Sequence, residues 1–137
     1  MINGTFKGEG SAWTMHFEKQ IKEAADRATF RNLFGAISRI RKDAAKSIRR
    51  RKDPDIASPP GTPVFTHVGF AKQALWWDVT DESAIMGFRH SLFGTKGETH
   101  EFGKTEEGRD YPERPTVGPA LERNIERFQK DWRSSIY

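Results

Sequence analysis

Residues 30–48, FRNLFGAISRIRKDAAKSI, decide the fold because they carry the strongest helical pattern in the chain. Apolar side chains recur there every three or four positions, which places them along one face of a helix. This stripe consists of Phe30, Leu33, Phe34, Ile37, Ile40, Ala44 and Ile48. Gly35 lies within the pattern although glycine costs about 1 kcal/mol relative to alanine inside a helix. We therefore expect Gly35 to mark a site of close packing.

A second apolar stripe precedes the first at the same helical spacing. It consists of Trp13, Phe17, Ile21, Ala24 and Ala28. Ser11 is the expected N-cap of this helix. The two stripes form either one long helix or two helices that meet near Thr29, in which case Asp26 or Thr29 would cap the second. Residues 1–12 contain three glycines and are predicted to be a flexible arm or a short strand.

Residues 47–69, SIRRRKDPDIASPPGTPVFTHVG, follow the stripe and combine a cationic run with a proline-rich loop. The run is Arg49, Arg50, Arg51 and Lys52, and the loop spans residues 53–66. Cations at a helix C-terminus complement the helix dipole, so one interpretation is a solvated helix end. The other interpretation is an electrostatic contact with nucleic-acid phosphates or an acidic protein surface. The composition favours neither.

After Gly69 the apolar pattern changes from helical spacing to alternation. Residues 70–74 are predicted to form a single helical turn, and residues 75–80 and 84–89 a β-hairpin. Trp76 and Trp77 are adjacent in the first strand and therefore face opposite sides of the sheet. One ring should enter the core. The other either anchors a subunit interface, where tryptophan is common, or is covered by the final helix.

The C-terminal third begins with residues 91–110, a charged, glycine-containing segment that is predicted to be a long mobile loop with a brief turn at residues 100–103. Prolines make residues 111–117 extended. A final helix then follows, with Pro119 in its first turn, where proline is tolerated. Its apolar stripe is Leu121, Ile125, Phe128, Trp132 and Ile136. Burial of four of these side chains would contribute about 6–12 kcal/mol before the entropic cost.

Taken together, these patterns predict one α+β domain over residues 1–137. Long N-terminal helices and a C-terminal helix would pack on a small antiparallel β-sheet. The chain has 137 residues, of which 35% are hydrophobic and 31% charged, with a net charge of +4. We therefore expect a thin core, further burial against other chains and acidic partners. The start of the chain does not resemble a signal peptide, and no apolar run approaches the roughly 20 residues of a membrane span.

The sequence argues against catalysis and against a resident metal or cofactor. There is no cysteine, and no two of the four histidines have the spacing that places two ligands on one helix face. A zinc site from His67, His90 and His100 is therefore disfavoured. The carboxylates Glu98 and Glu101 are interpreted as solvated loop residues rather than an acid–base pair. Nucleophile-elbow, Walker and dinucleotide-binding motifs are also absent from the sequence.

A series of short motifs, in fixed order, resembles a known family. These are SIRRRK (47–52), SPPGTP (58–63), the step from His67 to Gly69, IMGF (85–88), EFG (101–103), RPTVGPALERNI (114–125) and DWRSSI (131–136). Their order resembles the neck or tail-completion proteins of long-tailed bacteriophages and prophages, over residues 15–136. The most specific part is the arginine-proline-x-x-glycine-proline-alanine-leucine motif that opens the last helix. The charged segment 91–110 has no counterpart in the resemblance.

The resemblance implies a virion structural protein without catalytic activity. Subunits would form a ring, expected to be hexameric, between the DNA-filled head and the tail, after assembly in the host cytoplasm. Partners would be copies of the chain, head–tail connector or stopper proteins, and tail terminator or tail tube proteins. Arg49, Arg50, Arg51 and Lys52 would face the DNA channel or an acidic neighbour. The expected subunit-interface residues are Trp76, Trp77, Pro59, Pro60 and Phe65. The alternative function is a nucleic-acid-binding module that uses residues 49–52.

Overall fold

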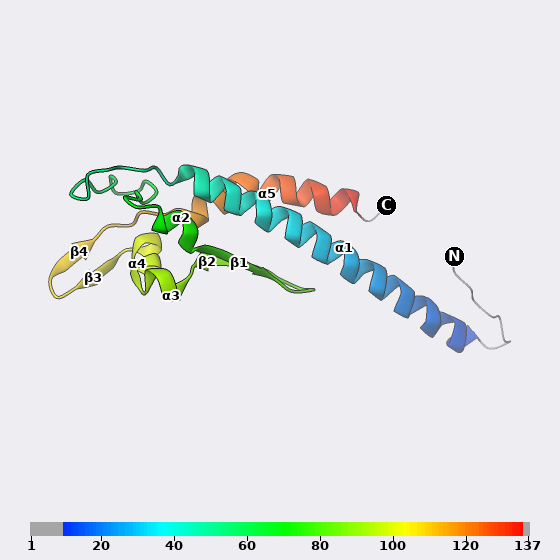
Figure 1. The fold of residues 1–137 in the computed structure, drawn as a ribbon. Coiled ribbons are helices and arrows are strands. Elements are labelled where there is room, and N and C mark those ends of the chain that lie inside the picture. The colour runs from blue at the N-terminus through cyan, green and yellow to red at the C-terminus, as the bar shows by residue number, and fades with distance from the viewer. Residues whose placement is uncertain (1–9, 136–137) are drawn as a thin grey trace.

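The structure is a computed structural model that describes residues 10–135, with side chains from residue 21 onward. The elements are α1 (Gly10–Ser47), α2 (Phe70–Ala74), β1 (Leu75–Val79), β2 (Ala84–Phe88), α3 (His90–Phe93), α4 (Lys96–Phe102), β3 (Lys104–Glu106), β4 (Arg109–Tyr111) and α5 (Val117–Ser134) (Figure 1). β1 pairs with β2 and β3 with β4, each pair antiparallel. The predicted α+β class, the hairpin and the short helix at residues 70–74 are confirmed.

α1 is one continuous helix of 38 residues, about 57 Å long. The two-helix alternative is therefore wrong. The Thr29 hydroxyl does not cap a new helix but donates to the Ala25 carbonyl oxygen one turn earlier, at 2.8 Å. The helix already begins at Gly10, so Ser11 is not its N-cap. Residues 10–12, predicted to belong to an arm or strand, are helical, and the rest of that prediction lies outside the described residues.

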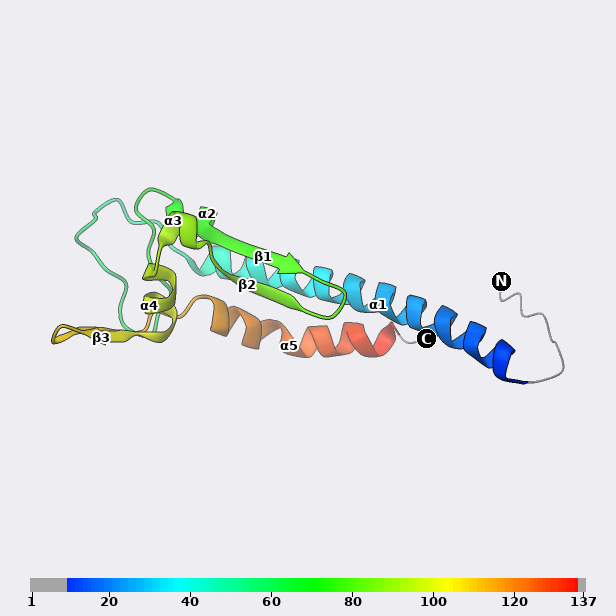
Figure 2. The same cartoon turned by 90° about the horizontal axis from the view of Figure 1, so that it is seen from below.

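α1 packs against both the β1–β2 hairpin and α5, and Figure 2 shows the three running alongside one another. The main partner of α5 is thus α1, whereas the sequence had indicated the sheet. The core lies where these layers meet the segment after α1. It consists of Ile40, Ala44, Ile48, Val64, Ala71, Leu75 and Ala120. The N-terminal half of α1 extends beyond both neighbouring layers (Figures 1 and 2).

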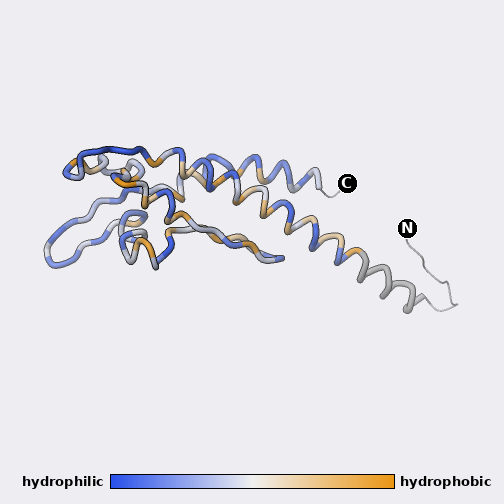
Figure 3. The backbone as a smooth tube through the Cα atoms, in the orientation of Figure 1, coloured by the Kyte–Doolittle hydropathy of each residue, from blue (hydrophilic) through white to orange (hydrophobic). Residues whose placement is uncertain are grey.

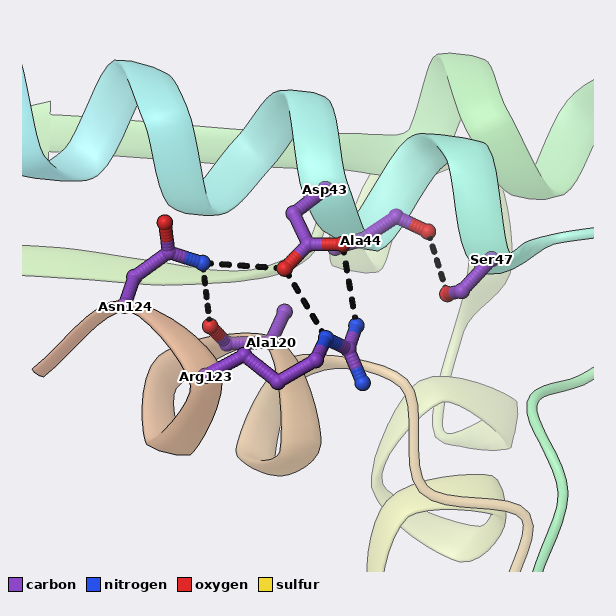
Figure 4. Close-up of polar contacts among 6 residues, drawn as sticks. All are labelled: Asp43, Ala44, Ser47, Ala120, Arg123 and Asn124. Atoms are coloured by element: carbon purple, nitrogen blue, oxygen red, sulfur yellow. Dashed lines mark hydrogen bonds and ion pairs between the residues drawn. The ribbon is translucent and has the colours of Figure 1, made fainter.

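The seam between α1 and α5 is held by polar contacts as well as by the core (Figure 4). Asp43 accepts from the Arg123 guanidinium at 2.9 and 3.1 Å and from the Asn124 amide at 2.9 Å. Further along the seam, Arg39 pairs with Asp131 at 2.6 Å. The hydrogen bond from Arg123 is the main cause that holds the Asp43 pKa below its ordinary value. Desolvation opposes it, and the positive charge of Arg123 and the Asn124 amide lower the pKa further. Because these partners sit at fixed positions on both helices, they set the register of α5 along α1.

Gly35 does not mark close packing, contrary to the prediction. A methyl group placed there would meet only the Arg39 guanidinium, at 3.6 Å, which is an ordinary contact distance. The helix therefore carries a glycine at a position where alanine fits.

The cationic run lies beyond the helix, not in its last turn. α1 ends at Ser47, and Lys46 is the basic residue of the last turn. Arg50 instead forms a parallel bridge with Thr66. In this bridge the Arg51 amide donates to the Thr66 carbonyl oxygen at 3.0 Å, and the Thr66 amide donates to the Arg49 carbonyl oxygen at 2.9 Å. Pairing with a segment 16 residues away keeps the chain extended, so the interpretation as a solvated helix end is wrong.

Residues 91–110 form ordered elements, which corrects the prediction of a mobile loop. α3, α4 and the β3–β4 hairpin occupy this segment, and residues 100–102 form the last turn of α4 rather than an isolated turn. Gly94 and Gly103 end the two helices with positive φ angles of 56° and 69°. Their amides donate to the His90 and Thr99 carbonyl oxygens. α3 has only four residues and α4 is largely hydrophilic (Figure 3), so neither produces an apolar stripe in the sequence.

Candidate interaction surfaces

Two of the motifs that are separate in the sequence, SPPGTP and RPTVGPALERNI, meet at one junction of hydrogen bonds. The Arg114 guanidinium Nε donates to the Ser58 carbonyl oxygen at 2.8 Å, and the Arg114 amide donates to the His100 carbonyl oxygen. The Gly61 amide donates to the Glu113 carbonyl oxygen at 2.8 Å. We call Ser58, Gly61, His100, Glu113 and Arg114 the motif junction. It ties together the SPPGTP loop, the end of α4 and the segment that leads into α5.

Glu101 caps α5 from the neighbouring helix. Its carboxylate accepts from the amides of Thr116 at 2.9 Å, Val117 at 3.1 Å and Gly118 at 2.7 Å. These amides have no partner within the helix, and a negative charge is favourable at a helix N-terminus. Glu101 is therefore a structural group, not the solvated loop carboxylate that the sequence suggested. No local spacing reveals this role, because capping residues are normally sought immediately before the helix.

The cationic run lies in the extended segment that follows α1. Each of its four residues is more than one-third accessible to solvent. Within residues 21–135, none of the four forms an ion pair. The Arg51 guanidinium carbon lies 5.3 Å from the centre of the Phe65 ring, a cation–π distance. The Arg51 carbonyl oxygen also lies 2.9 Å from His67 Nδ1. The structure thus places Arg51 beside one predicted interface residue, where its exposed charge is accessible to an anionic partner.

The five predicted interface residues fall into two groups on different elements. Trp76 and Trp77 lie on β1, whereas Pro59, Pro60 and Phe65 lie in the loop after α1. Trp77 is half-buried and packs edge-on against Phe34 of α1, with ring centres 5.2 Å apart. Trp76 is on the opposite face of the hairpin and is 40% exposed. α5 does not cover it, so of the two alternatives the structure leaves Trp76 open to a partner.

Large apolar side chains are also exposed on the helices. On α1, Ile21 is 54% and Phe34 46% exposed. On α5, Leu121 and Ile125 are 47% and 44% exposed, and the remaining described members of that stripe are half-buried. Ile136 lies outside the described residues. The apolar stripe of α5 is buried only in part because α5 packs mainly on a single helix, and a pair of helices covers a narrow strip. Such exposed apolar surface is typical of interaction sites.

A cavity of about 270 Å³ lies next to the motif junction. Its polar lining includes Ser58, Lys96, His100 and Arg114, and its walls include Phe65 and other apolar side chains. Burial lowers the pKa of His100, and the positive charges of Arg114 and Lys96 lower it further. We call this the cationic cavity.

The described residues contain no group of three His, Asp or Glu side chains that could hold a metal ion. None of the described helices is both long enough and apolar enough to cross a bilayer. No protein-family model, curated protein or solved structure matches this chain.

Proposed function

We propose that this chain is a structural protein of a tailed-bacteriophage virion, a ring subunit of the neck that completes the tail and joins it to the DNA-filled head. The observation that carries the proposal is that three family-like motifs bond to one another, because Arg114 contacts Ser58 and Glu101 accepts from the amides of residues 116–118. Short motifs scattered along a sequence carry little weight individually. Here their residues bond to one another, which supports the view that the resemblance concerns one folded unit.

The distribution of apolar surface also supports a ring subunit. The core is small, while α1, the β1–β2 hairpin and α5 each expose large apolar side chains. A ring closed by rotation joins two different surfaces of neighbouring subunits, and the contact adds burial that the isolated chain lacks. The projecting half of α1 offers such a surface to a neighbour (Figure 1).

In this proposal the exposed run from Arg49 to Lys52 faces either the DNA channel or an acidic adjoining ring. Electrostatic contacts with phosphates carry no sequence information, so DNA can move past them. The adjoining rings are head–tail connector or stopper proteins on one side and tail terminator or tail tube proteins on the other. Six copies are proposed for the ring, as the family resemblance implies.

The test is deletion of the gene from the phage that encodes this chain, followed by electron microscopy and proteomics of the particles. We expect filled heads and tails that fail to join, and wild-type virions that contain the protein at the copy number of one ring. Fully joined, infectious particles without the protein would contradict the proposal.

A nucleic-acid-binding module is the second candidate, and it is favoured by the four exposed cations of the run, which form no ion pair within residues 21–135. The isolated chain would then bind DNA tightly, with an affinity that falls steeply as salt concentration rises. Replacement of Arg49, Arg50 and Arg51 by alanine would remove about three phosphate contacts. The slope of log affinity against log salt concentration would become correspondingly less steep. Tight binding by a monomer that is absent from virions would favour this function over the neck.

A further inference from the structure

The cationic cavity is suited to an anionic group. Its lining residues include Lys96 and Arg114 but no aspartate or glutamate, so the charge inside is positive. Ser58 also belongs to this lining, and its hydroxyl is almost fully buried and has no hydrogen-bond partner within the described residues. A buried polar group without a partner is unfavourable. A carboxylate that entered the cavity would neutralise the two cations.

The β3–β4 hairpin projects from the same end of the molecule (Figures 1 and 2). Every residue from 104 to 111 is exposed. Two strands of three residues do not bury enough surface to be stable alone, so we expect the hairpin to pack against another chain. Its accessible tip carries the carboxylates of Glu106 and Glu107.

The conformation of Glu107 strengthens this expectation. Glu107 and Gly108 form the two-residue turn, with positive φ angles of 50° and 73°. Such a turn favours asparagine, aspartate or glycine at its first position, and a glutamate there is strained. Strained residues often serve a function that outweighs the local cost. This strained residue lies in the turn, beyond the last paired residues, Glu106 and Arg109.

The positions of the cavity and the hairpin suit a ring whose axis runs along the length of the molecule. Rotation about a ring axis brings together surfaces that lie at the same height along that axis. The hairpin and the cationic cavity both lie at the end of the molecule where α2, α3 and α4 are found (Figure 2). They are different surfaces, so a contact between them propagates from copy to copy around the ring.

We propose that the Glu107 carboxylate of one copy enters the cationic cavity of the next copy and pairs there with Lys96 and Arg114. The inference rests on the proposed ring and specifies one of its contacts. The occupant of the cavity is thus a second copy of this chain.

Charge reversal of the full chain tests the contact, with association followed by sedimentation velocity and native mass spectrometry. Glu107→Lys and Lys96→Glu are each expected to weaken association by roughly tenfold or more. The variant that combines both substitutions exchanges the two charges across the contact and is expected to recover most of the wild-type affinity. Glu82→Lys at the tip of the other hairpin makes the same charge change and should leave association unchanged.

Glu107→Asn separates the contact from folding. Asparagine suits the turn better, so thermal stability should stay constant or rise, while association should fall as in Glu107→Lys. Equal losses in the single and double reversals, or a wild-type chain that remains monomeric at every concentration, would overturn the inference. If the contact is overturned in this way but virions contain the protein at the copy number of one ring, the proposed function is still supported. If association recovers in the double variant but the protein is absent from virions, the neck function is contradicted and the contact between copies is supported.

Discussion

Glu101 joins two helices, because its carboxylate on α4 accepts hydrogen bonds from three amides at the start of α5. Glu101→Ala is expected to lower the free energy of unfolding by about 1–3 kcal/mol, since a buried helix end loses its charged acceptor. Urea denaturation of the full chain measures the change. Glu98→Ala on the same helix is the control and should stay within about 0.5 kcal/mol of the wild type. Similar losses in both variants would show that the cap has no special role.

His100 should make folding sensitive to mildly acidic pH. Burial is the main cause that lowers its pKa in the folded state, followed by Arg114 and Lys96. The unfolded chain therefore takes up a proton near pH 6.5 while the folded chain still resists it. The free energy of unfolding is therefore highest above about pH 6.5. It declines as the pH falls from there toward the lowered folded-state pKa of His100.

Urea titrations at several pH values measure this dependence. His100→Asn is expected to flatten the profile in that window, whereas His90→Asn, at an exposed position, should leave it unchanged. An unchanged slope in His100→Asn would assign the dependence to other groups.

At the scale of elements, α1 carries a correctable weakness at Gly35. Gly35→Ala is expected to raise the free energy of unfolding by up to about 1 kcal/mol, because alanine is the better helix former and its methyl group fits at an ordinary contact distance. Thermal and urea unfolding measure the gain. Gly97→Ala is the contrasting variant, because a methyl group there would lie 2.6 Å from Phe88 Cβ and must destabilise the chain. A loss in Gly35→Ala would show that the glycine has a packing role after all.

The pairing of α1 with α5 should show a small but measurable coupling between Asp43 and Arg123. A double-mutant cycle with Asp43→Ala and Arg123→Ala is expected to give about 0.2–1 kcal/mol, since the pair is largely solvated. Arg123 keeps the Asp43 pKa low in the folded state. The pair therefore contributes its full stabilisation above about pH 4, and this stabilisation is lost as the pH falls through the lowered pKa of Asp43. A coupling that is unchanged at acidic pH would indicate that the carboxylate charge is not involved.

At the scale of the whole molecule, the exposed apolar faces predict that stability depends on association. Because only the folded chain presents these faces, the thermal midpoint should rise with protein concentration. Calorimetry over a wide range of concentration tests this. Trp76→Ser removes a large exposed ring and should reduce the concentration dependence, while the midpoint at the lowest concentration stays near that of the wild type. A midpoint independent of concentration would identify a stable monomer.

The elements that could be predicted from the sequence are those with a local physical cause. The apolar spacing of residues 30–48 gives helix α1, and the alternation on either side of Asp81 gives the β1–β2 hairpin, because each pattern follows from backbone geometry within one segment. The order of the motifs suggested a function, but their spacing did not show that Ser58, His100 and Arg114 meet.

Only the tertiary structure decided how these segments combine, because the deciding contacts join residues far apart in the chain. Thr66 keeps the cationic run extended, Glu101 caps α5, and Asp43 holds α5 on α1. Each hydrogen bond depends on a position in space that no sequence spacing encodes. The short elements in residues 91–110 likewise depend on neighbours, since helices of one or two turns are not stable alone. Local propensity therefore determined the elements, and long-range pairing determined the arrangement and the surfaces that remain exposed.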